Sequence, residues 1–447
     1  MKSKQLLFLL LILSLSFTAA CGSVDGIGGN EPLVFADGLT DVIYVRTSAF
    51  GDGTGSSWEN ATDNLQQAIN DVSAASDKTH VFILAGTYKP TLAANTITGG
   101  TAARQVHFSL RNNVAVIGGF KGNETGYEPS LPSSATVLSG DLADNDTEDE
   151  DGNFLNRDDN AYHVFYHPDG TSLNNTAKLY NVTITGGYAD GGGHHNGGGG
   201  MFNYRNSPIV SNCGFNKNTA IGQSGGAVGG GGMCNFISSP ELNNCSFNGN
   251  IVEWDGGGLY NNNSSPILTN CTFENNSIIG IGSGGATYNR VNSNPKFEGC
   301  FFTANSAISY GGGMGNWEKS SPVLTDCHFI SNTAANGGGI SNWESISTLA
   351  NCTFTGNTAT PNSSFSIAYG GGMFNNGSNG LRSDITFNGI CTFNNNKAIG
   401  TNAKGGAIYC SDYSSIINLL SNVQYGTGTN MNTANGVQND YVKEGAE

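Results

Sequence analysis

The stretch GGGLYNNNSSPILTNCTFENNSI, residues 256–278, decides the fold of this chain. Three short pieces of it alternate apolar and polar residues and are separated by Gly, Asn, Ser or Pro, which is typical of short β-strands. The same order of pieces returns along the chain: a glycine run with an aliphatic residue, then Ser-Pro-x-[Leu/Val]-x-Asn, then Cys-x-Phe-x-x-Asn. The stretch therefore predicts one coil of a repeated structure.

The Cys-x-Phe-x-x-Asn block marks each repeat. Successive cysteines of the block lie 32, 26, 29, 27, 25 and 39 residues apart, and most of these periods are too short for three strands and a helix. Three strands per repeat, stacked about 4.8 Å apart, predict an all-β fold, a right-handed parallel β-helix, because parallel crossovers strongly favour that hand. The blocks are Cys213–Asn218, Cys245–Asn250, Cys271–Asn276, Cys300–Asn305, Cys327–Asn332, Cys352–Asn357 and Cys391–Asn396.

Equivalent positions of stacked coils should form ladders. We expect the cysteines, the phenylalanines and the aliphatic residues after the glycine runs to point inward, while Asn and Gly satisfy the turns. Cysteines stacked in register keep their Cβ atoms about 4.8 Å apart, beyond the usual limit of about 4.5 Å for a disulfide. We therefore predict a reduced cysteine ladder in the core. Cys234 and Cys410 fall elsewhere in the repeat, and their redox state stays open.

The pairing of G-G-[AG]-[ILM] with F-x-x-N resembles the repeats of chlamydial polymorphic outer membrane proteins and of β-helix lipoproteins from Bacteroidetes. The resemblance extends over roughly residues 198–411. Upstream, the segments Ile43–Val45, Val81–Tyr88 and Val116–Phe120 resemble the opening of pectate-lyase-like β-helices. Both resemblances imply the fold and leave the activity open.

The N-terminal residues predict export and anchoring. Lys2 and Lys4 precede the apolar run Leu6–Phe17 and three small residues, as in a signal peptide. Cys21 follows in a context that resembles the lipobox of bacterial lipoproteins, which implies acylation of Cys21 and a lipid anchor in the outer membrane, at the cell surface. We expect a signal peptide over 1–20, a lipid-anchored tether over 21–40, an N-terminal cap with the first coils over 41–125, coils with an acidic loop insertion over 126–197, the repeat β-helix over 198–411, and a closing strand (416–423) with a tail over 412–447.

A solenoid exposes unpaired strand edges at its ends and needs caps. The tetrapeptide Ser56–Glu59 matches a capping box and predicts the start of a helix that caps the N-terminal end. The predicted apolar face of this helix is Trp58, Ala61, Leu65, Ala68, Ile69 and Val72.

The charge balance limits the partners. The chain has 19 basic and 35 acidic residues and a net charge of −16, which excludes nucleic acid as a probable partner class and means that a polyanionic substrate would need a bridging cation. We expect a monomer that contacts a polysaccharide or another cell-surface component.

Two clusters suggest metal ions. Nine carboxylates crowd into residues 141–159, where Arg157 is the one basic residue. Their D-x-D-x-E spacing suits calcium, whereas an acidic insertion is also typical of a solvated loop. His194 and His195 are adjacent, as zinc ligands can be, but lie in a glycine-rich loop that is poorly preorganised. The candidate calcium ligands are Asp144, Asp146, Glu148, Asp149 and Asp151, and no other cofactor is expected.

The residues after the glycine runs carry the candidate function. If the aliphatic residue points inward, alternation sends the residues one and three positions later outward, and each coil then presents at least one aromatic ring. Such rows suit stacking on the sugar rings of an extended glycan, unless a segment covers them or the rings only pack on each other. The first outer column is Phe202, Cys234, Tyr260, Tyr288, Gly315, Ser341 and Phe374; the second outer column is Tyr204, Phe236, Asn262, Arg290, Trp317, Trp343 and Asn376. The candidate ligand-binding residues are Tyr204, Phe236, Tyr260, Arg290, Trp317 and Trp343.

Two classes of function stay open. The first is a surface lipoprotein that binds an extended glycan or another surface component, in adhesion or a structural role. The second is a polysaccharide lyase or a glycoside hydrolase, which needs clustered carboxylates or a calcium ion with a base nearby. The outward positions of the Cys-x-Phe strands hold no pair of acids, so we favour binding and assign no catalytic residue. The weak catalytic candidates are Asp255, Arg290, Glu318 and Glu344.

Overall fold

The computed structural model gives the course of most of the chain. It describes residues 39–72, 77–91, 102–124, 126–150, 154–222, 229–378, 381–411, 414–417, 422–427, 431–434, 437–438 and 440–443. The predicted signal peptide and Cys21 lie outside these residues. Within them, none of the helices has the length and apolar character that a membrane crossing requires.

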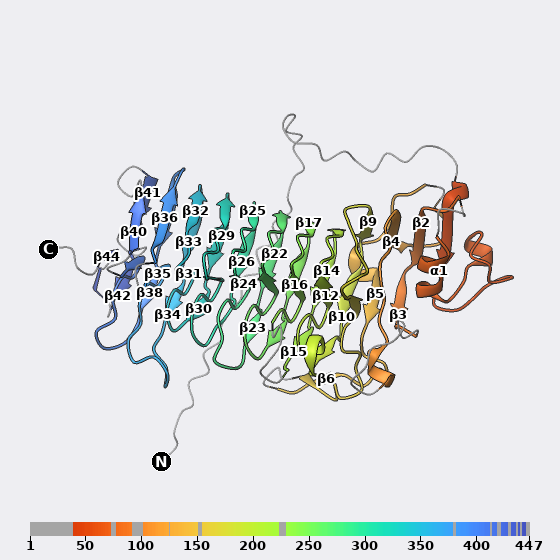
Figure 1. Ribbon diagram of the computed structural model, residues 1–447, viewed down its shortest axis with the longest axis horizontal. Coiled ribbons are helices and arrows are strands. Elements are labelled where there is room, and N and C mark those ends of the chain that lie inside the picture. Colours follow the sequence, from red (N-terminus) through yellow and green to blue (C-terminus); the bar gives the residue numbers. More distant parts are fainter. Residues whose placement is uncertain are drawn as a thin grey trace, which may run out of the picture. The chain divides into compact units, whose positions relative to one another are not determined.

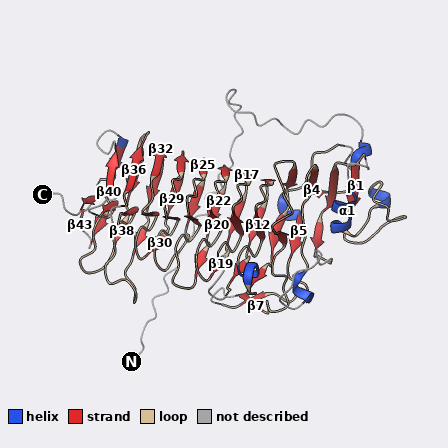
Figure 2. Cartoon of the chain, in the orientation of Figure 1, coloured by secondary structure: helices blue, strands red, loops and turns tan. Residues whose placement is uncertain are grey.

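Three parallel sheets run along the described part of the chain (Figure 1, Figure 2). Each successive coil adds one strand to each sheet, and equivalent residues of neighbouring coils are partners, as Phe247 and Phe273 are. The predicted right-handed parallel β-helix is therefore confirmed. The described residues are nearly all-β: their one α-helix is α1 (Leu65–Asp71), and their 3-10 turns are η1 (Leu39–Asp41), η2 (Trp58–Asn60), η3 (Ala102–Gln105), η4 (Ser133–Ala135) and η5 (Gly193–Asn196).

The strands of the three sheets are as follows. The first sheet has 12 described strands: β1 (Val42–Val45), β2 (His80–Leu84), β4 (Val114–Phe120), β9 (Ala177–Tyr180), β13 (Ile209–Ser211), β17 (Glu241–Asn243), β21 (Ile267–Thr269), β25 (Lys296–Glu298), β28 (Val323–Thr325), β32 (Ser347–Ala350), β36 (Ser383–Phe387) and β40 (Ser414–Ile417). The second sheet has 11: β3 (Gly86–Tyr88), β5 (Thr136–Ser139), β10 (Thr183–Thr185), β14 (Gly214–Asn216), β18 (Ser246–Asn248), β22 (Thr272–Glu274), β26 (Phe301–Thr303), β29 (His328–Ile330), β33 (Thr353–Thr355), β37 (Cys391–Asn394) and β41 (Val423–Tyr425). The third sheet has 10: β8 (Phe165–His167), β12 (Met201–Tyr204), β16 (Met233–Phe236), β20 (Leu259–Asn262), β24 (Thr287–Arg290), β27 (Met314–Trp317), β31 (Ile340–Trp343), β35 (Met373–Asn376), β39 (Ile408–Cys410) and β44 (Tyr441–Lys443).

Shorter ladders complete the coils. Many coils add a strand of two residues after the second sheet, which the three-strand prediction did not include. These strands are β11 (Tyr188–Ala189), β15 (Thr219–Ala220), β19 (Ile251–Val252) and β23 (Ser277–Ile278), and then β30 (Thr333–Ala334), β34 (Thr358–Ala359), β38 (Lys397–Ala398), β42 (Thr433–Ala434) and β43 (Val437–Gln438); β6 (Thr147–Glu148) and β7 (Phe154–Leu155) form a separate hairpin.

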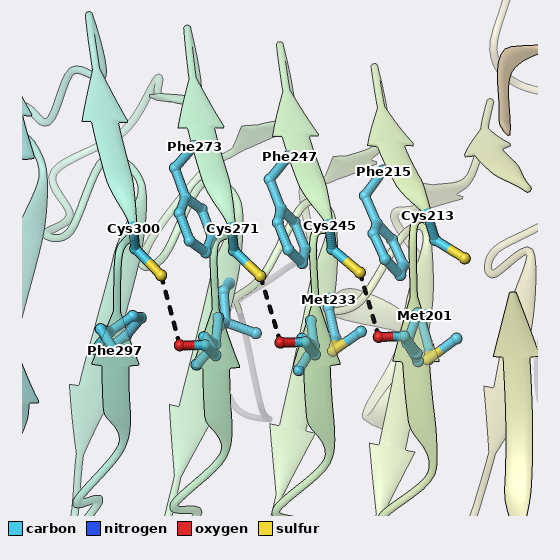
Figure 3. Close-up of a cluster of buried hydrophobic side chains, with 14 of the residues drawn as sticks. Met201, Cys213, Phe215, Met233, Cys245, Phe247, Cys271, Phe273, Phe297 and Cys300 are labelled. Atoms are coloured by element: carbon cyan, nitrogen blue, oxygen red, sulfur yellow. Dashed lines mark hydrogen bonds between the residues drawn. The ribbon is translucent and has the colours of Figure 1, made fainter. Parts of the chain in front are cut away.

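The core is built from ladders of identical side chains. The phenylalanine rings of the repeat block stack at centroid distances of 4.4–5.1 Å. Figure 3 shows the thiols beside them, where Cys245 Sγ donates to the Val210 carbonyl oxygen of the preceding coil at 3.4 Å and Cys271 repeats this contact with Leu242 at 3.5 Å. All the described cysteines are free and buried, Cys234 and Cys410 included. The predicted reduced ladder is therefore confirmed.

Two ladders of buried asparagines join the coils. In the turn ladder, formed by the last residue of each repeat block, the backbone N–H of Asn276 and its Nδ2 both donate to Asn305 Oδ1, at 3.0 and 2.9 Å. Asn305 Nδ2 in turn donates to the Asn332 Oδ1 of the next coil at 2.9 Å. The turn ladder comprises Asn218, Asn250, Asn276, Asn305, Asn332, Asn357, Asn396 and Asn432.

The sheet ladder runs through the centre of the third sheet from Asn203 to Asn342, each Nδ2 donating to the next Oδ1. At its N-terminal end, His167 Nδ1 donates to Asn203 Oδ1 at 2.8 Å, while His167 Nε2 accepts from the Leu110 N–H at 3.1 Å. At its other end the ladder is broken, because Asn342 Nδ2 and Asn375 Oδ1 are both buried without a hydrogen-bond partner.

The two ends of the fold differ from the prediction. Ser57 makes no side-chain cap, and the helix starts later, at Leu65, where Asn64 accepts the N–H of Gln67. Leu65 belongs to the main core, whereas Trp58 packs in a separate cluster with the residues of the first strands, so the predicted face is split by the turn between them. The closing strand predicted over 416–423 is also wrong, since β40 and β41 belong to two different sheets. The chain continues to coil there instead of ending on one strand.

We predict that Asn305→Ala strongly destabilises the fold. The substitution leaves the amide groups of Asn276 and the carbonyl of Phe273 without their partner, and each buried unsatisfied group costs about 1–3 kcal/mol. Urea denaturation should show a loss of at least about 3 kcal/mol. Asn248, exposed on β18, is the matched control, and Asn248→Ala should stay within about 0.5 kcal/mol of the wild type. Equal effects of the two substitutions would contradict the ladder's role.

We also predict that His167 makes the stability pH-dependent. Burial lowers the pKa of His167 to about 4, because the charged imidazolium loses its hydration there, although the hydrogen bond to Asn203 acts in the opposite direction. The contribution of neutral His167 to the free energy of unfolding is complete above the ordinary pKa of about 6.5 and is lost as the pH falls toward about 4. It amounts to about 3 kcal/mol. Thermal unfolding across this range should show a shallower pH dependence for His167→Gln than for the wild type. An unchanged profile for His167→Gln would refute this.

Candidate functional site

The second outer column lies where alternation places it. Its members are half-exposed along the outer side of the third sheet, one per coil. Tyr204 and Phe236 stack at a centroid distance of 5.4 Å, and Trp317 and Trp343 stack at 4.7 Å, each pair within 8° of parallel. The parallel register, in which Trp317 is the partner of Trp343, holds these rings one coil apart. The rings thus form two short stacks, with Arg290 of β24 between them.

A left-handed backbone position follows the column in these coils. Ile237 has a φ of 52° and Val291 a φ of 54°, which is unusual for β-branched residues. The bend ends each strand directly after the second outer column and turns the chain toward the first sheet. The column therefore lies at an edge of the third sheet, beside a turn. The other residues that directly follow the column with a positive φ are Arg205, Asn263, Glu318 and Glu344.

The first outer column is buried, and the prediction that it faces solvent is wrong. Tyr260 is 3% exposed and Tyr288 is 5% exposed, and they pack in an apolar cluster separate from the core. The glycine-rich segments that lead into the third sheet cover them: a Cβ added at Gly229 would be 2.4 Å from the Tyr260 ring. Burial raises the pKa of Tyr260 to about 12. Tyr260 is thus removed from the candidate ligand-binding residues.

A cavity of about 410 Å³ lies at the C-terminal end of the second outer column. Trp343 lines it together with rings that sequence reasoning did not propose as site residues. Tyr310 and Tyr369 each precede a glycine run, in the identical sequence YGGGM, and this repeated position was a signal that could have located them. The cavity is lined by Tyr310, Asn336, Trp343, Ser364, Phe365, Ser366, Ile367, Tyr369, Phe374, Asn376, Tyr409 and Ser411, none of which is charged.

The rings of the cavity support one another. Tyr310 lies edge-on to Trp343 at a centroid distance of 5.5 Å, and Tyr369 packs on Tyr409 at 4.4 Å. Such contacts fix ring orientations before any ligand arrives. The outer side of the third sheet therefore carries an aromatic face made of the second outer column and this cavity.

The four weak catalytic candidates do not form one group. Arg290 Nη2 pairs with Glu318 Oε1 at 2.9 Å, and Glu344 accepts a hydrogen bond from Ser378. Asp255 is half-buried and accepts the N–H of Ser283 at 2.9 Å, and its burial raises the pKa of the carboxyl to about 6. Each carboxylate thus has its own protein partner, which is the arrangement of structural ion pairs and caps.

The acidic insertion pairs with more cations than its sequence suggests. Asp144 contacts Lys89 at 2.7 Å, Asp146 contacts Arg157 at 3.2 Å, and Glu148 contacts Lys217. Lys89 follows β3 and Lys217 follows β14, which are in coils on either side of the insertion, so the view that Arg157 alone offsets these acids is wrong. Burial raises the pKa of Asp146 and lowers that of Arg157.

The predicted calcium ligands do not converge. The carboxylates of Asp144, Asp146 and Glu148 face three different cations. Asp146 and Glu148 line a cavity of about 330 Å³, and Asp144 does not. In the part of the chain that the structure describes, no three His, Cys, Asp or Glu side chains are grouped to hold a metal ion. Asp151 lies outside that part. The described residues therefore do not fit calcium.

The two predicted zinc ligands are separated by their environments. His195 is buried, with its Nδ1 2.9 Å from Nε2 of His163, whereas His194 is exposed beside Tyr204. His163 Nδ1 donates to the Gly198 carbonyl oxygen at 2.9 Å, so its Nε2 accepts from His195. Burial lowers the pKa of His195 to about 4 and holds the pKa of His163 well below its ordinary value. These histidines form a neutral buried pair and do not fit a zinc site.

Comparisons with known proteins concern the fold. No family model matches the sequence, and no curated protein matches it. Among solved structures, the chain is similar to pectate lyase Pel9A at 13% identity and a TM-score of 0.39, covering 86% of this chain and 78% of that one. It is also similar to the Dettilon tailspike protein (12%, 0.35, 87% and 71%) and to the Streptococcus pneumoniae surface protein and adhesin PfbA (10%, 0.32, 85% and 94%). At these identities the likeness is one of parallel β-helix architecture alone.

Proposed function

We propose that this protein is a cell-surface lipoprotein that binds an extended glycan along the aromatic face of its β-helix, in adhesion or a structural role. One observation carries the proposal: half-exposed rings in stacked coils lead into an uncharged, ring-lined cavity. Exposed apolar rows on a soluble surface commonly mark binding sites. Aromatic rings present flat apolar faces, which match the apolar faces of sugar rings.

An extended ligand is favoured by the geometry of the column. Tyr204 and Trp343 lie on the same side of the third sheet, separated by the coils of β16, β20, β24 and β27. Neighbouring coils are about 4.8 Å apart, so the column spans several sugar residues. The partner in this proposal is a polysaccharide or another surface component, and the protein acts as a monomer.

The enzymatic alternative has less support. A lyase or a glycoside hydrolase requires acid and base groups that converge on one bond of the substrate. Asp255, Glu318 and Glu344 are each engaged with a different partner. The raised pKa of Asp255 is explained by its burial. Binding without catalysis is therefore the function that we propose.

Export and anchoring complete the proposal. The signal peptide over 1–20 and the acylation of Cys21 would place the β-helix on the outer membrane, most simply at the cell surface. The repeats would then belong with those of β-helix lipoproteins from Bacteroidetes and of chlamydial polymorphic outer membrane proteins. In that arrangement the lipid supplies the attachment and the aromatic face supplies the recognition.

Removing the tryptophan stack should weaken glycan binding. A glycan array identifies a ligand for the wild type, and Trp317→Ala with Trp343→Ala should reduce its affinity by about 1–3 kcal/mol, by analogy with bases stacked on aromatic side chains. The double variant should lose less stability than the about 3–5 kcal/mol that truncating a buried tryptophan costs. Calorimetric titration and thermal melting measure the two effects.

The matched control is Phe301→Ala, because Phe301 is an exposed ring on the second sheet that stacks on His328. It should leave glycan affinity unchanged. A tryptophan double variant that melts much earlier, together with a wild type that binds nothing on the array, would refute the binding face.

Cys21→Ser tests the anchor. We expect this variant to lose acyl labelling and to leave the membrane fraction, because several acyl chains give durable anchoring without a spanning helix. Cell fractionation and labelling with a fatty-acid analogue measure both. Full membrane retention of the variant without a lipid signal would contradict the proposal.

A further inference from the structure

The second outer column stops at Trp343, where a cavity takes the place of the next ring. Trp317 stacks on one side of Trp343 at 4.7 Å. In the following coil the partner of Trp343 is Asn376, which carries an amide instead of a ring. Trp343 and Asn376 both line the cavity of about 410 Å³. The stack therefore ends on an indole that borders an open space.

The other aromatic stack ends differently. The partner of Phe236 in the next coil is Asn262, whose Nδ2 donates to the hydroxyl of Tyr260 at 3.2 Å. The side-chain amide of Asn376 makes no hydrogen bond with the described part of the protein. Asn376 therefore offers one donor group and one acceptor group to a ligand, whereas Asn262 is already engaged.

A preorganised loop forms one wall of the cavity. Residues 360–372 connect β34 to β35, whereas residues 335–339 make the same connection in the preceding coil. Asn362 fixes the insertion: its Oδ1 accepts the N–H groups of Ser364 and Phe365 at 2.9 and 3.1 Å, and its Nδ2 donates to the Ile308 carbonyl oxygen at 2.7 Å. The Phe365 ring packs edge-on against Tyr310 at 5.1 Å. A wall built in advance lowers the entropy lost on binding.

The chemistry of the lining selects an uncharged ligand. The side chains that line the cavity are rings, amides, hydroxyls and one aliphatic group. A carboxylate or sulfate placed there would lose hydration without meeting a cation, and the net charge of −16 would oppose its approach. The volume lies within the range of about 300–1,000 Å³ that is typical of small-molecule sites.

We infer that this cavity is the subsite for a neutral pyranose residue, whose ring stacks on Trp343 and whose hydroxyl groups hydrogen-bond the amide of Asn376. The inference rests on the proposed function and deepens it by naming the substrate class. It assigns Asn376 and the loop that carries Phe365 to the recognition of uncharged polysaccharide and excludes polyuronates and sulfated glycans as ligands of this subsite.

Calorimetric titration of the mature protein with defined oligosaccharides tests this. The neutral probes are cellohexaose, mannohexaose, xylohexaose and laminarihexaose, and the anionic probe is hexagalacturonate. We expect a neutral probe to bind and the anionic one not to bind. Asn376→Ala should weaken the neutral probe about 3- to 10-fold, the usual value of one uncharged hydrogen bond. Asn376→Trp should weaken it more, because the indole stacks on Trp343 and fills the cavity, and the fold should be retained in thermal melting.

Asn248→Ala, which changes an exposed asparagine of β18 on the second sheet, is the control and should leave the affinity unchanged. Preferred binding of hexagalacturonate would overturn the neutral subsite and leave the aromatic face standing. Unchanged affinity in both Asn376 variants, with loss of binding in the tryptophan double variant, would also overturn the subsite alone. A wild type that binds none of the neutral probes would overturn the inference, and the wider glycan array would then decide the proposed function separately.

Discussion

The hydrogen bonding of buried asparagine amides is the constraint on which this structure depends. A side-chain amide that is fully removed from water needs partners for its donors and its acceptor, and in the turn ladder those partners belong to the coils before and after. Asn305 bonds both neighbouring coils in this way, Phe273 and Asn276 of the coil before and Asn332 of the coil after. A coil therefore cannot satisfy its own turns, and the solenoid is stable only as a stack. The backbone ladders of the three sheets then follow from the register that these amides impose.

The parts of the fold that could be predicted from the sequence are those in which every member of a ladder is buried. The Cys-x-Phe-x-x-Asn block predicted the second sheet and the turn ladder, because the same three residue types recur at its fixed positions in each repeat. The burial of the first outer column could not be predicted. Alternation decides on which side of a sheet Tyr260 lies, but it does not decide whether Gly229 and its neighbours cover that side. The helix that caps the N-terminal end was predicted, but its first residue was misplaced for a related reason. The capping-box pattern over Ser56–Glu59 is short, and Asn64 provides a competing cap just before the helix.

The candidate site shows the same division. The position of the second outer column could be predicted from the repeat, because alternate side chains of each strand in the third sheet point outward. The cavity could not, because it depends on the path of the connection over residues 360–372 and on rings such as Tyr310 that precede the glycine runs. Stacking also explains why aromatic residues accumulate on this face: the spacing of coils and the preferred separation of parallel rings are nearly equal. A solenoid offers this match at every coil, so few substitutions are needed to extend or interrupt an aromatic row.

The break in the sheet ladder between Asn342 and Asn375 gives the stack a preferred seam. Two buried amide groups meet there without bonding each other, and each is turned to another partner, Asn342 to Ser347 and Asn375 to Ser383. In a quasi-one-dimensional protein, cooperativity is carried by the contacts between neighbouring units. A junction that lacks one of its side-chain hydrogen bonds couples the two neighbouring coils less strongly. The coils beyond this junction, which contribute Asn376 and Tyr409 to the cavity, can therefore open at a lower free energy than the coils before it, and such an opening would remove one side of the cavity.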